Sequence, residues 1–167
     1  WGIVEALNKG ADMVVGGRLA DAALVMGPAA WHFQWQPTDW DQLAGAAVAG
    51  HIIECSAQAT GGNYSFVDEV PSFSNVGFPI AEMEADGAAT ITKHPQTGGL
   101  VSIGTVTAQL LYEVREPSYL TPDVIARFDT IEISEDGDDR VRIQGVKGEA
   151  PTLSSKVCIN NLGGYRN

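Results

Sequence analysis

The sequence TDWDQLAGAAVAGHIIECSAQATGGN, residues 38–63, predicts the helix around which we expect the rest of the fold to pack. Thr38 and Asp39 form a typical helix start, and the pair Gly61-Gly62 is a typical stop, so we expect a helix over about residues 38–59. Residues 44–50 are all Ala, Gly or Val, and such small side chains let another backbone come close. The sequence therefore predicts a helix buried in a crowded part of the core.

One side of this predicted helix changes from apolar to polar along its length. At helical spacing the side chains are Trp40, Leu43, Ala47, His51, Glu54 with Cys55, and Gln58. An unpaired buried polar group costs about 1–3 kcal/mol, so an inward-facing stripe must find polar partners or a ligand at its polar end. We interpret this end as the wall of a cleft. The alternative is that the helix simply reaches the surface there.

The residue types at this polar end are suited to catalysis. His51 and Glu54 are candidate catalytic residues as acid or base, and Cys55 is a candidate nucleophile if its pKa is lowered. The alternative for Cys55 is a buried, inert thiol. A metal site made by these three side chains would lack a fourth ligand and matches no known spacing, so we expect neither a metal nor another cofactor.

On the N-terminal side, the sequence ADMVVGGR predicts a buried strand over residues 11–16, followed by a tight turn. A helix, a glycine and a buried strand in succession are typical of a parallel α/β sheet. Ligands usually bind in the loops after such strands, which makes Arg18 and Asp21 candidate substrate-binding residues. The alternative is a solvated arginine and a helix cap.

On the C-terminal side, a second strand is expected at residues 89–93, and an antiparallel hairpin at about 129–144, with Glu132 and Arg142 paired on its exposed face. The predicted fold class is therefore α/β, with a mostly parallel sheet, flanking helices and an antiparallel β-hairpin near the C-terminal part.

Two Thr-Gly-Gly triplets occur at residues 60–62 and 97–99. Their glycines expose backbone N–H groups, and the second triplet precedes a predicted helix whose N-terminus favours negative charge. We expect both triplets to surround one anion, with Lys93 nearby; the alternative is a helix C-cap and a plain turn. The complete set of expected substrate-binding residues is Arg18, Asp21, Gln58, Thr60, Gly61, Gly62, Asn63, Lys93, Thr97, Gly98 and Gly99.

The composition excludes several classes of partner. A net charge of −11 over 167 residues argues against nucleic acid and anionic membrane surfaces, which require clustered Lys and Arg. No apolar run reaches the roughly 18–20 residues that span a bilayer. The two cysteines, Cys55 and Cys158, match neither a disulfide-rich scaffold nor a zinc spacing, so we expect reduced thiols and a cytoplasmic protein.

Four stretches together resemble the acyclic terpene utilisation protein A family. They are GADMVVGGRLADAALVMGP, WDQLAGAAVAGHIIECSAQATGGN, GFPIAEMEADGAATITKHPQTGGLVS and QLLYE followed by PSYLTPDV. The chain departs from the family pattern at Arg115-Glu116, where a Gly-Asp pair is expected before Pro117. Family members are much longer, so the resemblance implies that residues 1–167 are either a single α/β domain or the middle of a longer one whose N-terminal region is missing.

The resemblance also implies a metabolic context. Family members occur with enzymes that degrade citronellol and geraniol as CoA thioesters. It implies an enzyme of lyase, hydratase or transferase type, acting on an acyl-CoA thioester or a related carboxylic acid. The alternative is a non-catalytic subunit that holds an acyl-CoA or docks to a partner enzyme. Both leave open whether the chain forms a homo-oligomer.

Overall fold

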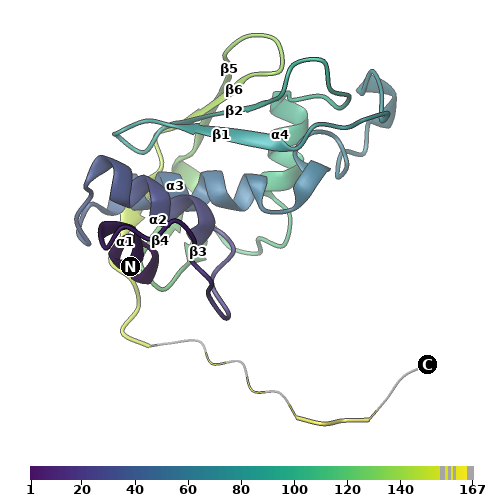
Figure 1. Ribbon diagram of the computed structural model, residues 1–167. Coiled ribbons are helices and arrows are strands. Elements are labelled where there is room, and N and C mark those ends of the chain that lie inside the picture. The colour runs from purple at the N-terminus through teal and green to yellow at the C-terminus, as the bar shows by residue number, and fades with distance from the viewer. Residues whose placement is uncertain (155–156, 158, 160, 165–167) are drawn as a thin grey trace.

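Helix α3 (Trp40–Ile53) lies at the centre of the molecule in a computed structural model that describes residues 1–154, 157, 159 and 161–164. Residues 43–52 of this helix are all buried. Helices α1 (Gly2–Asn8) and α2 (Ala23–Phe33) lie on one side of it, and a four-stranded sheet lies on the other (Figure 1). A helix that is apolar on every side is stable only when surrounded in this way.

The larger sheet consists of β1 (Pro79–Met83), β2 (Ala89–Lys93), β5 (Glu132–Glu135) and β6 (Val141–Gln144), in the order β1-β2-β6-β5. A second sheet has the order β3 (Ser118–Leu120), β4 (Ile125–Arg127) and β7 (Lys147–Glu149). The remaining elements are α4 (Ile103–Leu110) and the short 3-10 helices η1 (Ser56–Gln58), η2 (Val67–Glu69) and η3 (Phe128–Thr130). Side chains from both sheets join those of α3 in one core.

The prediction of a mostly parallel sheet is wrong, because every pairing between strands in the described residues is antiparallel. The connections explain this. A tight turn at Asp86-Gly87 joins β1 to β2, and residues 136–140 join β5 to β6. A parallel pair would need a crossover of a dozen or more residues. The strand at 89–93 and the hairpin over about 129–144 are confirmed, with Ile133 opposite Ile143.

The predicted strand at residues 11–16 is also wrong. This segment is irregular, and its apolar side chains are exposed. The exposed fraction is 81% for Met13 and 88% for Val15. No strand of either sheet in the described part of the chain pairs with it. A short apolar run becomes a strand only when a neighbouring strand supplies hydrogen bonds, and the sequence pattern alone does not report that neighbour.

Glycines of α3 allow other backbones to approach closely. A Cβ atom at Gly45 would lie 2.0 Å from the carbonyl oxygen of Gly87, in the β1–β2 turn. A Cβ atom at Gly50 would lie 2.7 Å from Cα of Ala22, which is fully buried just before α2. The small residues predicted to permit close packing therefore do so at both ends of the 44–50 segment.

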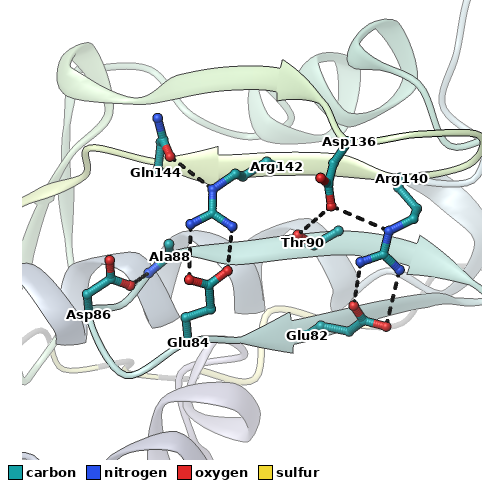
Figure 2. A network of polar contacts seen from close by, with 9 residues as sticks. All are labelled: Glu82, Glu84, Asp86, Ala88, Thr90, Asp136, Arg140, Arg142 and Gln144. Carbon is teal, nitrogen blue, oxygen red and sulfur yellow. Dashed lines mark hydrogen bonds and ion pairs between the residues drawn. The ribbon is translucent and has the colours of Figure 1, made fainter.

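A row of ion pairs covers the outer face of the larger sheet (Figure 2). Arg140 Nη2 lies 2.7 Å from Glu82 Oε2, and Arg142 is paired with Glu84 in the same way, with Nη2 at 3.0 Å from Oε2. Both arginines reach across β2, where Thr90 is buried beneath them. The predicted pair between Glu132 and Arg142 is wrong, because the hairpin register places Glu132 opposite Gln144.

Candidate functional site

His51 is buried in the last turn of α3, with 2% of its side chain exposed. Its Nε2 atom lies 3.2 Å from the carbonyl oxygen of Leu110, at the end of α4. A carbonyl oxygen only accepts hydrogen bonds, so Nε2 carries a proton and donates it to Leu110. Burial lowers the pKa of His51, which keeps the imidazole neutral at pH 7 and leaves Nδ1 as an acceptor.

Glu54 faces this acceptor from the C-terminal end of the helix. Its Oε1 atom lies 3.4 Å from His51 Nδ1, and only 10% of its side chain is exposed. Burial, followed by the negative charges of Asp21 and Glu113, raises the pKa of Glu54 to about 7. Glu54 is therefore close to half protonated at neutral pH, beside the unprotonated Nδ1 atom of His51.

Three buried polar atoms at this place have no hydrogen-bond partner among the described residues. They are Nδ1 of His51, Oε2 of Glu54 and Oε1 of Gln58. Gln58 ends η1, the short helix that follows α3 after a break at residues 54–55 and begins at Ser56, where φ is +53°. The predicted helix over 38–59 is therefore interrupted, because α3 itself ends at Ile53. Unpaired buried polar atoms are uncommon in folded proteins and mark this cluster as a candidate site.

An aromatic wall supports His51. The ring of Tyr119 lies 5.2 Å from the imidazole and the ring of Phe128 lies 5.9 Å from it, measured between ring centroids. Burial, and then the charges of Glu54, Asp21 and Glu113, raise the pKa of Tyr119. Neither aromatic residue was predicted for the site, because both lie far from α3 in sequence.

Cys55 lies beside the pair but is not activated. Burial raises the pKa of its thiol, and the neighbouring charge of Glu54 raises it further. A nucleophilic cysteine needs the opposite effect, a lowered pKa from a nearby positive charge. The arrangement therefore favours the alternative of a protonated, inert thiol. Cys158 lies outside the described residues.

Gln109 is a site residue that sequence analysis missed. It is fully buried on α4, and its Nε2 lies 3.5 Å from the carbonyl oxygen of His51. Nδ2 of Asn63 lies 3.5 Å from Gln109 Oε1 and 3.4 Å from the carbonyl oxygen of Ala108. The sequence does contain one indication of Gln109. This polar residue lies three positions after Val106 and next to Leu110, on the side of α4 that is buried.

Asp21 and Arg18 belong to an open hollow next to the pair. Its lining is Gly17, Arg18, Leu19, Ala20, Asp21 and Leu24. The contact of Ala22 with Gly50 holds this loop against α3, one turn before Glu54. Asp21 is close enough for its charge to act on Glu54, whereas Arg18 makes no ion pair with a described residue.

The two Thr-Gly-Gly triplets come together, but their backbone N–H groups bind carbonyl oxygens of the protein. Leu100 N donates to Thr60 O at 2.9 Å, which joins the two loops. Gly98 N donates to Asn75 O, Gly99 N to Ser72 O, Gly61 N to Gln58 O and Gly62 N to Ala57 O. The hydroxyl groups of Thr60 and Thr97 likewise donate to carbonyl oxygens, those of Gly77 and His94. The donors expected for an anion are thus engaged in holding the loops.

Lys93 is engaged as well. Its Nζ lies 2.9 Å from Asp139 Oδ2 and donates to Thr97 O at 3.1 Å, with only 6% of the side chain exposed. This lysine neutralises a carboxylate and braces the second triplet. Among the described residues, no group of three His, Cys, Asp or Glu side chains is placed to hold a metal ion.

Comparison with known families gives one match. The model of the acyclic terpene utilisation family protein AtuA matches residues 1–167. Neither a curated protein nor a solved structure matches the chain. Within the described residues, no helix has both the length and the hydropathy needed to cross a membrane.

Proposed function

The chain belongs to the acyclic terpene utilisation family, and on this basis we propose that it is an enzyme that transfers protons on an acyl-CoA thioester or a related branched carboxylic acid. The reaction is of lyase, hydratase or transferase type. Glu54 is the acid or base, and His51 is the residue that orients it.

The observation that carries this proposal is the buried pair of His51 and Glu54. A general acid or base works best when its pKa lies near the pH of its surroundings, and burial brings Glu54 to about 7. As a carboxylate it can remove a proton from a substrate, and as a carboxylic acid it can return one. His51 is fixed by Leu110 and presents its unpaired Nδ1 atom 3.4 Å from Glu54 Oε1.

The hollow beside the pair supplies the approach for the substrate. Arg18 is exposed in its lining, where a guanidinium group can meet a phosphate or carboxylate of the ligand. Cys55 has no covalent role in this proposal, because its thiol stays protonated. Lys93 and the Thr-Gly-Gly triplets shape the loops around Gln58 instead of binding the ligand directly.

The test replaces Glu54 by glutamine in a cell that lacks the wild-type copy. Glu54→Gln keeps the size of the side chain but cannot accept or release a proton near pH 7, so growth on citronellol as sole carbon source is expected to stop. Glu5→Gln, an exposed change on α1, is the matched control and should grow normally. Both proteins must accumulate to the same level. Unchanged growth with Glu54→Gln rejects Glu54 as the acid or base.

A second candidate function is that of a non-catalytic docking subunit. The loop between η1 and β1 exposes large apolar side chains, which are Phe66, Val67, Phe73 and Phe78. Exposed apolar groups of this kind often mark protein interfaces. This function predicts that Phe66→Ser stops growth while Glu54→Gln does not, which is the reverse of the result expected for the enzyme.

A further inference from the structure

We propose that Asp139, in the turn between β5 and β6, is a positioning residue for the candidate site. Its carboxylate holds the start of α4, and the end of α4 supplies the carbonyl oxygen that fixes His51. The expected effect of Asp139 on activity rests on the proposed function, whereas its expected effect on His51 does not.

The carboxylate of Asp139 binds two parts of the loop that precedes α4. Oδ1 accepts a hydrogen bond from the backbone N–H of Val101 at 2.8 Å, and Oδ2 lies 2.9 Å from Nζ of Lys93. Lys93 in turn donates to the carbonyl oxygen of Thr97. Only 6% of the Lys93 side chain is exposed, so its charge needs this carboxylate. One side chain therefore restrains both ends of residues 97–101.

The turn that carries Asp139 is itself fixed to the larger sheet. Arg140 pairs with Glu82, and Asp136 accepts a hydrogen bond from Thr90 (Figure 2). The backbone of Asp139 is left-handed, with φ at +52°. Among residues other than glycine, aspartate and asparagine adopt this conformation most readily. Aspartate therefore suits this position on two grounds, its backbone conformation and its charge.

Helix α4 connects this turn with His51. It begins directly after Val101 with a capping box, in which Ser102 and Thr105 each bind the backbone N–H of the other. Eight helical residues rise about 12 Å, and a helix this short moves as a unit. At its far end the carbonyl oxygen of Leu110 lies 3.2 Å from Nε2 of His51. A displacement of the first turn of α4 therefore changes the contact that holds the imidazole.

The loop before α4 has a second anchor, which makes the proposal testable in a folded protein. The backbone N–H of Leu100 donates to the carbonyl oxygen of Thr60 at 2.9 Å. Because this hydrogen bond does not involve Asp139, loss of the carboxylate should loosen α4 without unfolding the core.

The test measures how fast the imidazole N–H of His51 exchanges with water, by ¹H–¹⁵N NMR at pH 7. The other two histidines, His32 and His94, are exposed, so a slowly exchanging imidazole N–H belongs to His51. Asp139→Gly removes the carboxylate and leaves the left-handed backbone unstrained. The matched control is Asp138→Gly, at the neighbouring exposed aspartate.

Exchange of the His51 proton should be at least about tenfold faster in Asp139→Gly than in wild type, and within about twofold of wild type in Asp138→Gly. Asp139→Asn retains an oxygen that can accept from Val101 N, so its rate should lie between those of wild type and Asp139→Gly. The backbone amides of residues 43–52 should exchange as in wild type, because the change is local to α4.

Two results overturn the inference and leave the proposed function standing. One is equal exchange of the His51 proton in the two glycine variants. The other is an equal acceleration of the His51 proton and of residues 43–52, which means a general loss of stability. If Asp139→Gly does not fold, Asp139→Asn decides, and a rate equal to that of wild type overturns the inference.

Growth on citronellol separates this inference from the proposed function. Asp139→Gly should grow more slowly than Asp138→Gly if His51 is needed for activity. If His51 responds to Asp139→Gly as expected but Glu54→Gln grows normally, the proposed function fails and the positioning role of Asp139 stands.

Discussion

At the scale of single residues, the position of one proton defines the chemistry of the candidate site. Nε2 of His51 donates a hydrogen bond to Leu110 O, so Nδ1 is left as an acceptor 3.4 Å from Glu54 Oε1. Two unprotonated acceptors at this distance repel each other. Glu54 holds a proton more readily here than in water, because burial and the charges of Asp21 and Glu113 raise its pKa.

This raised pKa predicts how stability depends on pH. Folded Glu54 has a pKa of about 7 against 4.5 when unfolded, so the folded state holds the proton more tightly between these values. Its contribution is present below pH 4.5 and is lost as the pH rises to about 7. Relative to wild type, Glu54→Gln should therefore gain stability from pH 4.5 to 7, by up to about 3 kcal/mol. Urea unfolding at several pH values measures this difference.

The control for this measurement is Glu5→Gln, whose difference from wild type should not follow the same pH course. His51 acts in the opposite direction, because its lowered pKa makes its contribution disappear as the pH falls below about 6.5. His51 is present in both Glu54→Gln and wild type, so the difference between the two proteins reports Glu54 together with its interaction with His51. A difference that stays constant from pH 4.5 to 7 would show that Glu54 ionises normally in the folded state.

At the scale of elements, the contact between α3 and the β1–β2 turn depends on Gly45. A methyl group there would lie 2.0 Å from the carbonyl oxygen of Gly87, so one backbone must move. Gly45→Ala should reduce the free energy of unfolding by at least about 2 kcal/mol, even though alanine favours a helix more than glycine does. Thermal or urea unfolding measures the loss.

The control is Gly2→Ala in α1, where the added methyl group meets no atom within 4 Å and the change should be neutral or slightly stabilising. An equal effect of the two substitutions on the free energy of unfolding would contradict the predicted clash.

The elements also show what the sequence could and could not predict. Local signals were sufficient for the central helix, the strand at 89–93 and the C-terminal hairpin, because each depends on spacing within one segment. The strand at 11–16 failed because a strand needs a partner from elsewhere in the chain. The end of the helix was predicted too far along the chain. Helix α3 ends at Ile53, and Ser56 beyond it adopts a left-handed conformation that its residue type does not signal.

The candidate site, too, was predictable only where it depends on spacing within one segment. The spacing of His51 and Glu54 on one helix was sufficient to expect that they face each other. Leu110 and Gln109 were not found, because α4 reaches α3 only through tertiary packing. The backbone N–H groups of the Thr-Gly-Gly triplets were expected to bind an anion, but they donate to carbonyl oxygens of the protein. Their acceptors, such as Ser72 and Asn75, lie in a loop that shows no regular pattern.

At the scale of the whole molecule, protection from solvent is uneven. Side chains of both sheets pack against α3 and shield it from solvent. By contrast, the N–H groups of residues 12–20 donate to no backbone carbonyl in the described part of the chain. Hydrogen exchange followed by mass spectrometry should therefore label residues 12–20 within seconds at pH 7, and residues 43–52 only by opening of the core. Strong protection of residues 12–20 would contradict the irregular conformation of this segment.

The order of strands in the larger sheet has a consequence for how the chain reaches its native state. The pairs β1–β2 and β5–β6 are each closed by a short turn, but the contact that joins them aligns Thr90 with Arg142. The entropy lost in closing a loop grows with the length of chain enclosed, so we expect the two hairpins to form early and independently. Docking of β2 on β6 then becomes the slow step, and it encloses α4 and β3–β4 as it occurs. The residues that bring Leu110 to His51 are thereby assembled in the same late event that completes the sheet.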